Sequence, residues 1–204
     1  MKLLVVVDYQ KDFVDGALGF EGAELLDEKI AAKIKKYADE KEMIVATFDT
    51  HYDYERLGVD GRVPAYMNTR EGKALPVEHC IIRTDGWDMY GKTNEAYKAA
   101  HAQTVTHDIY KESFGASPYN MEGLRNVIRD YRTRFARNGK TLNVESVELV
   151  GLVSNICVIS NAVMFQAAFP EAQIIVDTNC TASFDKAKHE ATLKVLEGLQ
   201  VKLV

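Results

Sequence analysis

The sequence has 204 residues, of which 47% are hydrophobic and 27% are charged, and its formal net charge is −5. This length can bury one full core, so we expect a single domain over residues 1–204. The negative net charge argues against a nucleic-acid partner. No apolar run approaches the ~20 residues needed to cross a bilayer, so no membrane partner is expected. Three cysteines without a C-x-x-C pair favour a reducing, cytoplasmic setting.

The first half of the chain contains two apolar runs that end in polar residues. Residues 3–7 (Leu-Leu-Val-Val-Val) are typical of a strand buried on both faces, and Asp8 follows them. A polar, glycine-containing loop is expected over residues 9–20, and a helix over residues 23–36, where apolar residues recur at helical spacing. A second buried strand is expected over residues 43–48, directly before Asp49, Thr50 and His51.

A long segment without sustained periodicity follows over residues 52–78, and loops of this length in compact domains are usually functional. The expected elements beyond it are a short extended piece over 79–82, a strand over 104–110 followed by Lys111, a helix over 124–135, a strand over 146–150, a strand over 173–176, a helix over 186–196 and a strand over 199–204.

Residues 151–158 read Gly-Leu-Val-Ser-Asn-Ile-Cys-Val and lie where a strand turns into a helix, with Ser154 or Asn155 as the expected N-cap. The free N–H groups of a helix start favour a thiolate at Cys157, and they can also hold an oxyanion beside the sulfur. A small buried cysteine that only packs is the alternative interpretation.

The alternation of strands and helices predicts a doubly wound parallel α/β sheet of about six strands with helices on both faces. Sheets of this kind bind ligands at the carboxyl ends of their strands. The chemically competent residues at those ends are Asp8, Asp49, His51, Lys111 and Cys157.

Three of these residues make a nucleophilic set. A carboxylate such as Asp8 can take the proton of Cys157 and return it to a leaving group, and Lys111 would keep that carboxylate ionised. Each residue has a structural alternative: Asp8 as a cap, Lys111 as a surface lysine. Their convergence at one edge of one sheet favours the catalytic interpretation.

Asp49 and His51 are two residues apart at a strand end, so both side chains point to one side and are placed to share a cation. His79 would be a third ligand that arrives from the far end of the long loop. Nitrogen and oxygen ligands with open positions suit zinc, iron or manganese. A hydrogen-bonded Asp–His pair without metal is the alternative.

Five segments together resemble the isochorismatase-like cysteine hydrolases, and within them the nicotinamidases most. They are Val-Asp-Tyr-Gln-Lys-Asp-Phe at 7–13, Phe-Asp-Thr-His at 48–51, Pro-Val-Glu-His-Cys at 76–80, Tyr-Lys at 110–111 and residues 151–158. The resemblance implies a catalytic triad of Asp8, Lys111 and Cys157, a cis peptide between Leu152 and Val153, and an oxyanion hole made by the backbone amides of Val153 and Cys157.

The resemblance also implies a divalent metal, zinc before iron or manganese, on Asp49, His51 and His79, where it would take the ring nitrogen of the substrate. No organic cofactor is expected. Two departures from the family pattern concern the pocket. Phe13 supplies one aromatic wall of the substrate pocket, but Leu75 or Pro76 stands where many nicotinamidases carry a second aromatic residue. The residues that could form this second wall instead are Trp87, Tyr52, Tyr54 and Tyr66. An additional ligand would have to come from Asp53, Glu55 or Asp60.

The sequence therefore predicts an amidohydrolase that releases ammonia from a small carboxamide, with nicotinamide as the favoured substrate and a thioester as the intermediate. The alternatives are a metal-independent relative that acts on another small amide, a carbamoyl compound or a vinyl ether, and a non-catalytic nucleotide-binding module. The second alternative lacks a G-x-G-x-x-G motif after the first strand. A homo-oligomer is left open, because the apolar residues 158–169 suit either a dimer or the monomer core.

Overall fold

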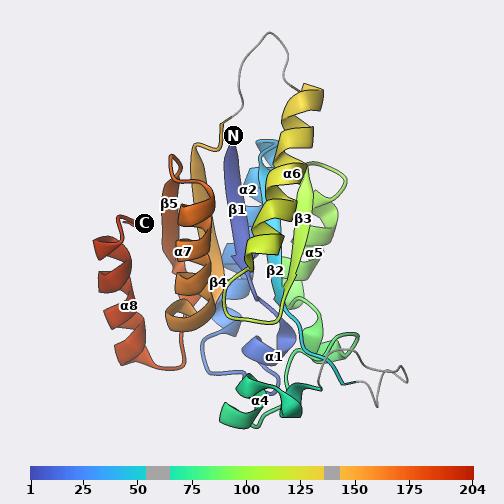
Figure 1. Ribbon diagram of the computed structural model, residues 1–204, viewed down its shortest axis with the longest axis vertical. Helices are drawn as coiled ribbons and strands as arrows, with labels where there is room; N and C mark the ends of the chain where they lie inside the picture. The colour runs from blue at the N-terminus through green and yellow to red at the C-terminus, as the bar shows by residue number, and fades with distance from the viewer. Residues whose placement is uncertain (54–64, 136–142) are drawn as a thin grey trace.

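The computed structural model describes residues 1–53, 65–135 and 143–204 and confirms the parallel α/β fold (Figure 1). Six strands form one sheet in the order β3-β2-β1-β4-β5-β6, and all neighbours are parallel. The strands are β1 (Lys2–Val7), β2 (Met43–Asp49), β3 (Thr106–Lys111), β4 (Ser146–Leu152), β5 (Gln173–Ala182) and β6 (Lys202–Leu203). The chain order reverses between β1 and β4, and such switch points create a crevice at the carboxyl ends of the strands.

Helices cover both faces of the sheet (Figure 1). On one face lie α2 (Asp27–Asp39) and α5 (Gly91–Ala100), and on the other lie α6 (Pro118–Phe135) and α7 (Ile159–Ala168). The helix α8 (Lys186–Gly198) stands beside the β6 edge, and the short helices α1 (Lys11–Val14) and α4 (Arg70–Ala74) lie beyond the carboxyl ends of the strands.

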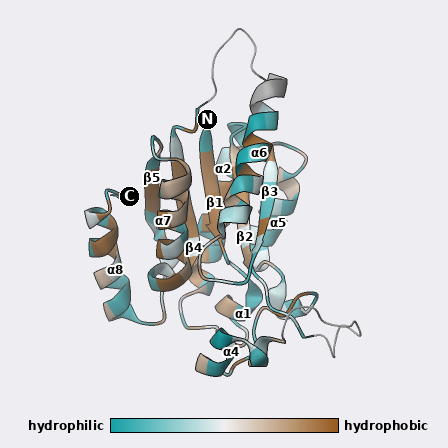
Figure 2. Cartoon of the chain, in the orientation of Figure 1, coloured by the Kyte–Doolittle hydropathy of each residue, from teal (hydrophilic) through white to brown (hydrophobic). Residues whose placement is uncertain are grey.

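The central strands β1, β2 and β4 are hydrophobic along most of their length, as Figure 2 shows for β1. In β1, Leu3, Val5 and Val7 belong to the core on the α6 and α7 side, whereas Leu4 and Val6 belong to the core on the α2 and α5 side. All five are fully buried. A strand covered on both faces needs apolar residues at every position, which explains the uninterrupted run in the sequence.

Gly151 allows β4 to approach β1 just before the segment that carries Cys157. Its φ is +111°, and a β-carbon there would lie 2.1 Å from the carbonyl oxygen of Val7. No larger residue fits without moving one of the two strands. The glycine therefore fixes how β4 delivers the next residues to the edge of the sheet.

Three of the described helices were not predicted from the sequence. The turn α1 lies inside the expected loop over residues 9–20, α4 lies inside the expected long loop over residues 52–78, and α5 lies in a stretch to which no element was assigned. The buried residues Thr93, Ala96 and Tyr97 do follow a helical spacing in α5. Its first turn is capped by the carboxylate of Asp27 in α2, which accepts hydrogen bonds from the backbone N–H groups of Lys92 and Thr93 at 2.8 Å. A cap supplied from another helix leaves no local signal.

The predicted strand ends also differ at the last two strands. β5 continues to Ala182, six residues beyond the expected end at residue 176, because its second half pairs again with β4 after an irregularity between Leu149 and Gly151. β6 is shorter than the expected 199–204, because residues 199–201 form the turn that ends α8.

The helix α7 buries Asn161, Ala162, Phe165 and Ala168, so the apolar segment 158–169 serves the core of this chain, and a homo-oligomer stays a prediction. Within the described ranges, no helix is both long and apolar enough to cross a lipid bilayer.

Candidate active site and metal centre

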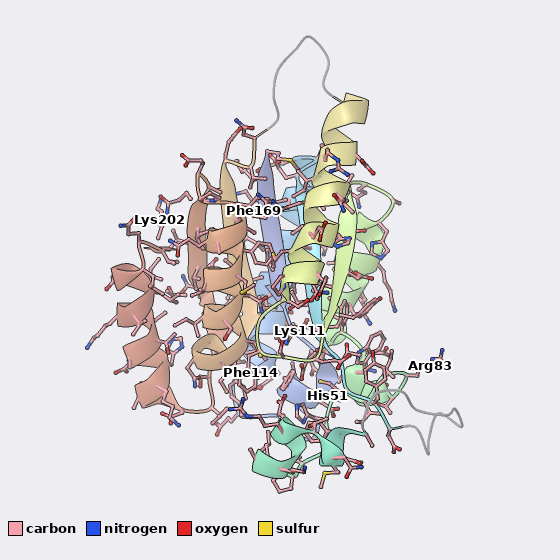
Figure 3. All side chains as sticks on the ribbon, viewed as in Figure 1. His51, Arg83, Lys111, Phe114, Phe169 and Lys202 are labelled. Carbon is pink, nitrogen blue, oxygen red and sulfur yellow. The ribbon has the colours of Figure 1, made fainter. Side chains whose placement is uncertain are left out.

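The carboxyl ends of four neighbouring strands bring the predicted nucleophilic residues together. Asp8 follows β1, Asp49 ends β2, Lys111 ends β3 in register with Asp49, and Cys157 lies in the π-helical turn Ser154–Val158 after β4. All four side chains are buried. Lys111 and His51 appear at this edge of the sheet in Figure 3.

Lys111 joins the other three groups. Its Nζ lies 2.7 Å from Oδ2 of Asp8, 3.3 Å from Oδ1 of Asp49 and 3.9 Å from Sγ of Cys157. Burial alone would disfavour its charge, but the carboxylates of Asp49 and Asp8 outweigh burial and hold the pKa of Lys111 well above its usual value. The ammonium is therefore a permanent positive charge beside the sulfur.

Asp8 is held so that one of its oxygens faces the ammonium. Thr47 donates a hydrogen bond of 2.6 Å from Oγ1 to Oδ1 of Asp8. Oδ2 lies 2.7 Å from Nζ of Lys111 and forms an ion pair with it. Burial raises the pKa of the Asp8 carboxyl, Lys111 opposes that rise, and Asp49 adds to it. A carboxylate with a raised pKa is a stronger base than one in water.

The backbone of Asp8 is unusual as well. Its φ is +44°, in the left-handed region that residues other than glycine seldom adopt. This conformation turns the chain out of the sheet directly after β1, and residues in it are concentrated at functional sites.

The environment of Cys157 favours the thiol, in contrast to the thiolate expected at a helix start. Burial raises its pKa well above the usual value, Lys111 lowers it only in part, and the negative charges of Asp8 and Asp49 raise it further. The predicted caps are also wrong. Val153 takes the N-cap position without a side-chain cap, whereas Ser154 Oγ lies 2.8 Å from Nδ1 of His189.

Asn155, the other expected cap, accepts a hydrogen bond from Ser183. The cis peptide between Leu152 and Val153 that the resemblance implies is present.

The three predicted metal ligands also meet. Oδ2 of Asp49 lies 3.1 Å from Nε2 of His51 and 3.4 Å from Nε2 of His79, and one potential ligand atom from each residue lies within 4.8 Å of the others. The backbone explains the approach: His51 pairs with Ile81 in an isolated parallel bridge, which carries His79 to the end of β2.

The donor set fits a cation. Nδ1 of His79 lies 2.8 Å from the carbonyl oxygen of Val77 and donates to it, which leaves the Nε2 lone pair for a ligand. Burial would raise the pKa of the Asp49 carboxyl, but Lys111, His51 and His79 outweigh it and lower that pKa, so Asp49 is ionised. Two imidazoles and a carboxylate are typical ligands of zinc.

Glu71 in α4 is a neighbour of this group that was not predicted from the sequence. Its Oε1 lies 4.0 Å from Nε2 of His79, and its side chain is 22% exposed. Burial and the charge of Asp49 raise the pKa of Glu71. Asp53 is not part of this cluster, and Glu55 and Asp60 lie outside the described residues. The signal for Glu71 was only its place in the long loop, eight residues before His79.

Phe13 is buried, and its ring stands edge-on to the imidazole of His79 with the ring centroids 5.6 Å apart. The Trp87 indole instead anchors its own loop, because it stacks on Tyr110 and donates to Thr50 Oγ1 at 3.1 Å.

Tyr66 is also held in place by contacts with neighbouring residues. Its hydroxyl donates to the carbonyl of Leu75 at 2.8 Å, and its ring covers His51 with centroids 4.5 Å apart. Of the other two expected walls, Tyr52 is half-buried and Tyr54 lies outside the described residues.

Known proteins share this fold. The family model for the isochorismatase domain matches residues 2–204. The solved structure of nicotinamidase from Bacillus subtilis aligns with a TM-score of 0.78 at 22% identity, over 100% of this chain and 98% of that one. Pyrazinamidase of Pyrococcus horikoshii in complex with zinc aligns with a TM-score of 0.67 at 20% identity, over 100% and 98% of the two chains.

N-carbamoylsarcosine amidase from Thermoplasma acidophilum aligns with a TM-score of 0.68 at 16% identity, over 99% of this chain and 94% of that one. At these identities the likeness concerns the fold. No curated protein sequence matches the chain.

Proposed function

The chain belongs to the isochorismatase family of hydrolases, and on that premise we propose that it hydrolyses a small carboxamide, nicotinamide before others, to the acid and ammonia. The observation that carries the proposal is the contact of Lys111 with both Asp8 and Cys157 in one buried site. A base, a nucleophile and a fixed positive charge are the parts that covalent amide hydrolysis requires.

In the proposed first step, Asp8 takes the proton of the Cys157 thiol as the sulfur attacks the amide carbonyl. Both groups have a raised pKa, so the thiol does not ionise unaided and the carboxylate is basic enough to assist it. Lys111 stabilises the negative charge that moves from the carboxylate to the sulfur.

The carbonyl oxygen becomes an oxyanion when the carbon–sulfur bond forms. The backbone N–H group of Val153, the N-cap of the π-helical turn, and that of Cys157 within the turn would receive it. One well-placed donor of this type contributes about 3 kcal/mol to the transition state. The carbon–nitrogen bond then breaks, and Asp8 returns the proton to the departing ammonia.

The product of that step is a thioester on Cys157. A water molecule completes the cycle: Asp8 takes one of its protons, the oxygen adds to the thioester carbonyl, and the carbon–sulfur bond breaks. The acid leaves, and the sulfur regains a proton. Overall, one amide and one water give one acid and one ammonia.

Asp49, His51 and His79 would hold a divalent metal, zinc before iron or manganese, and Glu71, whose Oε1 lies 4.0 Å from Nε2 of His79, would add a further carboxylate beside it. When bound, the metal supplies a Lewis acid that can coordinate a ring nitrogen. Phe13 packs on His79 and would form the adjoining wall, so a planar heteroaromatic amide would lie between the metal centre and Cys157.

A carbamoyl compound is the second candidate substrate, since two of the expected second walls, Trp87 and Tyr66, are engaged in contacts of their own. A substrate without a ring needs only one aromatic wall. The fold is shared with a carbamoylsarcosine amidase as well as with nicotinamidases.

The test is an ammonia-release screen over nicotinamide, pyrazinamide, aliphatic amides and N-carbamoyl amino acids, with and without chelator. We expect nicotinamide to be turned over fastest and the chelator to raise its KM. The Cys157→Ala variant is the control for contaminating amidases. Failure of every amide in the screen would overturn the proposal.

A further inference from the structure

We propose that Gln10 is a positioning residue that fixes the backbone of Asp49. In this way it also positions the Asp49 carboxylate, which contacts both Lys111 and the other proposed metal ligands. The metal part of this inference rests on the proposed function. Gln10 is almost fully buried, at 1% exposure, although its side chain is a neutral amide with no role in the mechanism above.

The sheet needs a substitute partner at this position. β1 and β2 pair in register from Leu3 with Met43 to Val7 with Thr47. At Asp8 the chain turns out of the sheet with a φ of +44°, so β1 offers no backbone alongside the last residue of β2. The peptide groups of Asp49 would be left without a partner on that side, and unpaired buried peptide groups are costly.

The side-chain amide of Gln10 takes the place of the missing strand. Its Oε1 accepts a hydrogen bond of 2.8 Å from the N–H of Asp49, and its Nε2 donates a bond of 3.0 Å to the carbonyl oxygen of the same residue. A planar amide that both accepts from and donates to one residue imitates a neighbouring peptide. Nε2 also donates to the carbonyl of Trp87 at 2.8 Å.

The amide is itself held on a fixed backbone. Gln10 forms an isolated antiparallel bridge with Met89, and the adjacent Lys11 donates its N–H to the carbonyl of Asp88 at 2.9 Å. The Gln10 amide therefore cannot shift together with Asp49. Its three hydrogen bonds hold the Asp49 backbone in one position.

That position matters because the two carboxylate oxygens of Asp49 serve different groups. Oδ1 lies 3.3 Å from Nζ of Lys111, and Oδ2 lies 3.1 Å from Nε2 of His51 and 3.4 Å from Nε2 of His79. A shift of the Asp49 backbone changes both sets of distances together. Residues that orient a metal ligand typically change metal affinity by 10- to 100-fold when they are replaced, so about that loss is expected here.

The test measures zinc affinity by competition with a chromogenic chelator in wild type, Gln10→Met and Gln10→Glu. Gln10→Met keeps the volume and removes all three hydrogen bonds, so we expect its zinc Kd to rise at least tenfold. Gln10→Glu keeps an acceptor for the Asp49 N–H and should lose less. The matched control is Thr93→Val in α5, which removes a buried hydrogen bond to the carbonyl of Asp27 in α2, away from the site. Its zinc Kd should stay within twofold of wild type.

Circular dichroism shows which variants fold. Wild-type zinc affinity in a folded Gln10→Met protein overturns the inference, as does a wild type that binds no zinc. If Gln10→Met does not fold, an unchanged Kd in Gln10→Glu overturns it. A wild type that binds zinc but releases no ammonia defeats the proposed function alone, because the comparison of zinc affinities does not depend on turnover.

Discussion

The ammonium of Lys111 lies 2.7 Å from the Asp8 carboxylate, and both side chains are completely excluded from solvent. Two buried ions stabilise the fold only as a pair, because removal of one leaves the other without compensation. Asp49 places a second carboxylate 3.3 Å from the same ammonium. Lys111 thus permits two acids to be buried beside the Cys157 thiol.

Replacement of Lys111 by methionine should lower the free energy of unfolding by about 3–5 kcal/mol, since two buried carboxylates lose their counter-ion. Urea unfolding at pH 7 measures this loss. In the double variant Asp8→Asn/Lys111→Met only one of the two carboxylates remains, so its loss should be smaller than the sum of the two single losses. Strictly additive losses would contradict the pairing.

The variant Cys157→Ala should fold normally and lose ammonia release by at least about 10⁴-fold, because no other group in the site can form the thioester. Cys80 is the matched control, because it is a buried thiol next to His79 in the chain and takes no part in the proposed mechanism. Cys80→Ala should retain most of the activity. Retained turnover in Cys157→Ala would remove the whole mechanism.

The pH dependence of kcat/KM should report Asp8. The carboxylate must be ionised to accept the thiol proton, and burial raises its pKa above the ordinary value of 3.8. Activity is therefore present above the raised pKa and is lost as the pH falls through it, so the acid limb should lie above pH 3.8. Intrinsic fluorescence over the same range separates this loss from unfolding. An acid limb at or below pH 3.8 in a folded enzyme would show that Asp8 is not the base.

The strand ends expected from the sequence were enough to predict which residues form most of this site. Each of the four residues Asp8, Asp49, Lys111 and Cys157 lies at the end of a strand, directly after it or in the turn behind it, and parallel strands bring such residues to one edge. What the sequence did not predict depends on contacts between distant segments. The pKa of Cys157 is one case, because its burial by the sheet and α7 outweighs the local effect of the helix start.

Gln10, Glu71 and the cap of α5 are the other cases. Gln10 replaces a strand only because Asp8 turns the chain away, and Glu71 approaches His79 only through the fold of the long loop. Asp27 caps a helix that starts more than sixty residues later in the chain. None of these partners is local, so neither periodicity nor a cap motif could identify them.

Glu71 allows a graded test of the metal centre. His79→Ala removes a ligand and should abolish zinc binding, measured as bound zinc after gel filtration. Glu71→Gln removes only the charge of a group 4.0 Å from Nε2 of His79, so it should weaken binding and keep the stoichiometry. Equal loss in the two variants would make Glu71 a ligand as important as His79. No loss in either would remove the metal centre.

Lys33 provides a test of stability away from the site. Its Nζ lies 2.6 Å from Oδ2 of Asp177 and 2.6 Å from Oε1 of Glu148, with the three side chains between 10% and 21% exposed. Burial would raise the pKa of Asp177, but the bond and charge of Lys33, together with the bond from the backbone N–H of Asn179, outweigh burial and lower it. A carboxyl whose folded pKa is lowered stabilises the fold above its unfolded pKa, near 3.8, and this contribution is lost as the pH falls through the folded pKa.

Urea unfolding at pH 6, 4.5 and 3.5 should therefore show a steeper acid loss in wild type than in Lys33→Met, where Asp177 is no longer held ionised. Lys35→Met, on the exposed side of the same helix, is the control and should follow the wild-type curve. Because Asp177 is mostly buried, the difference between wild type and Lys33→Met should survive 0.5 M salt, which screens exposed pairs. Parallel curves for wild type and Lys33→Met would mean that this ion cluster does not set the acid stability of the fold.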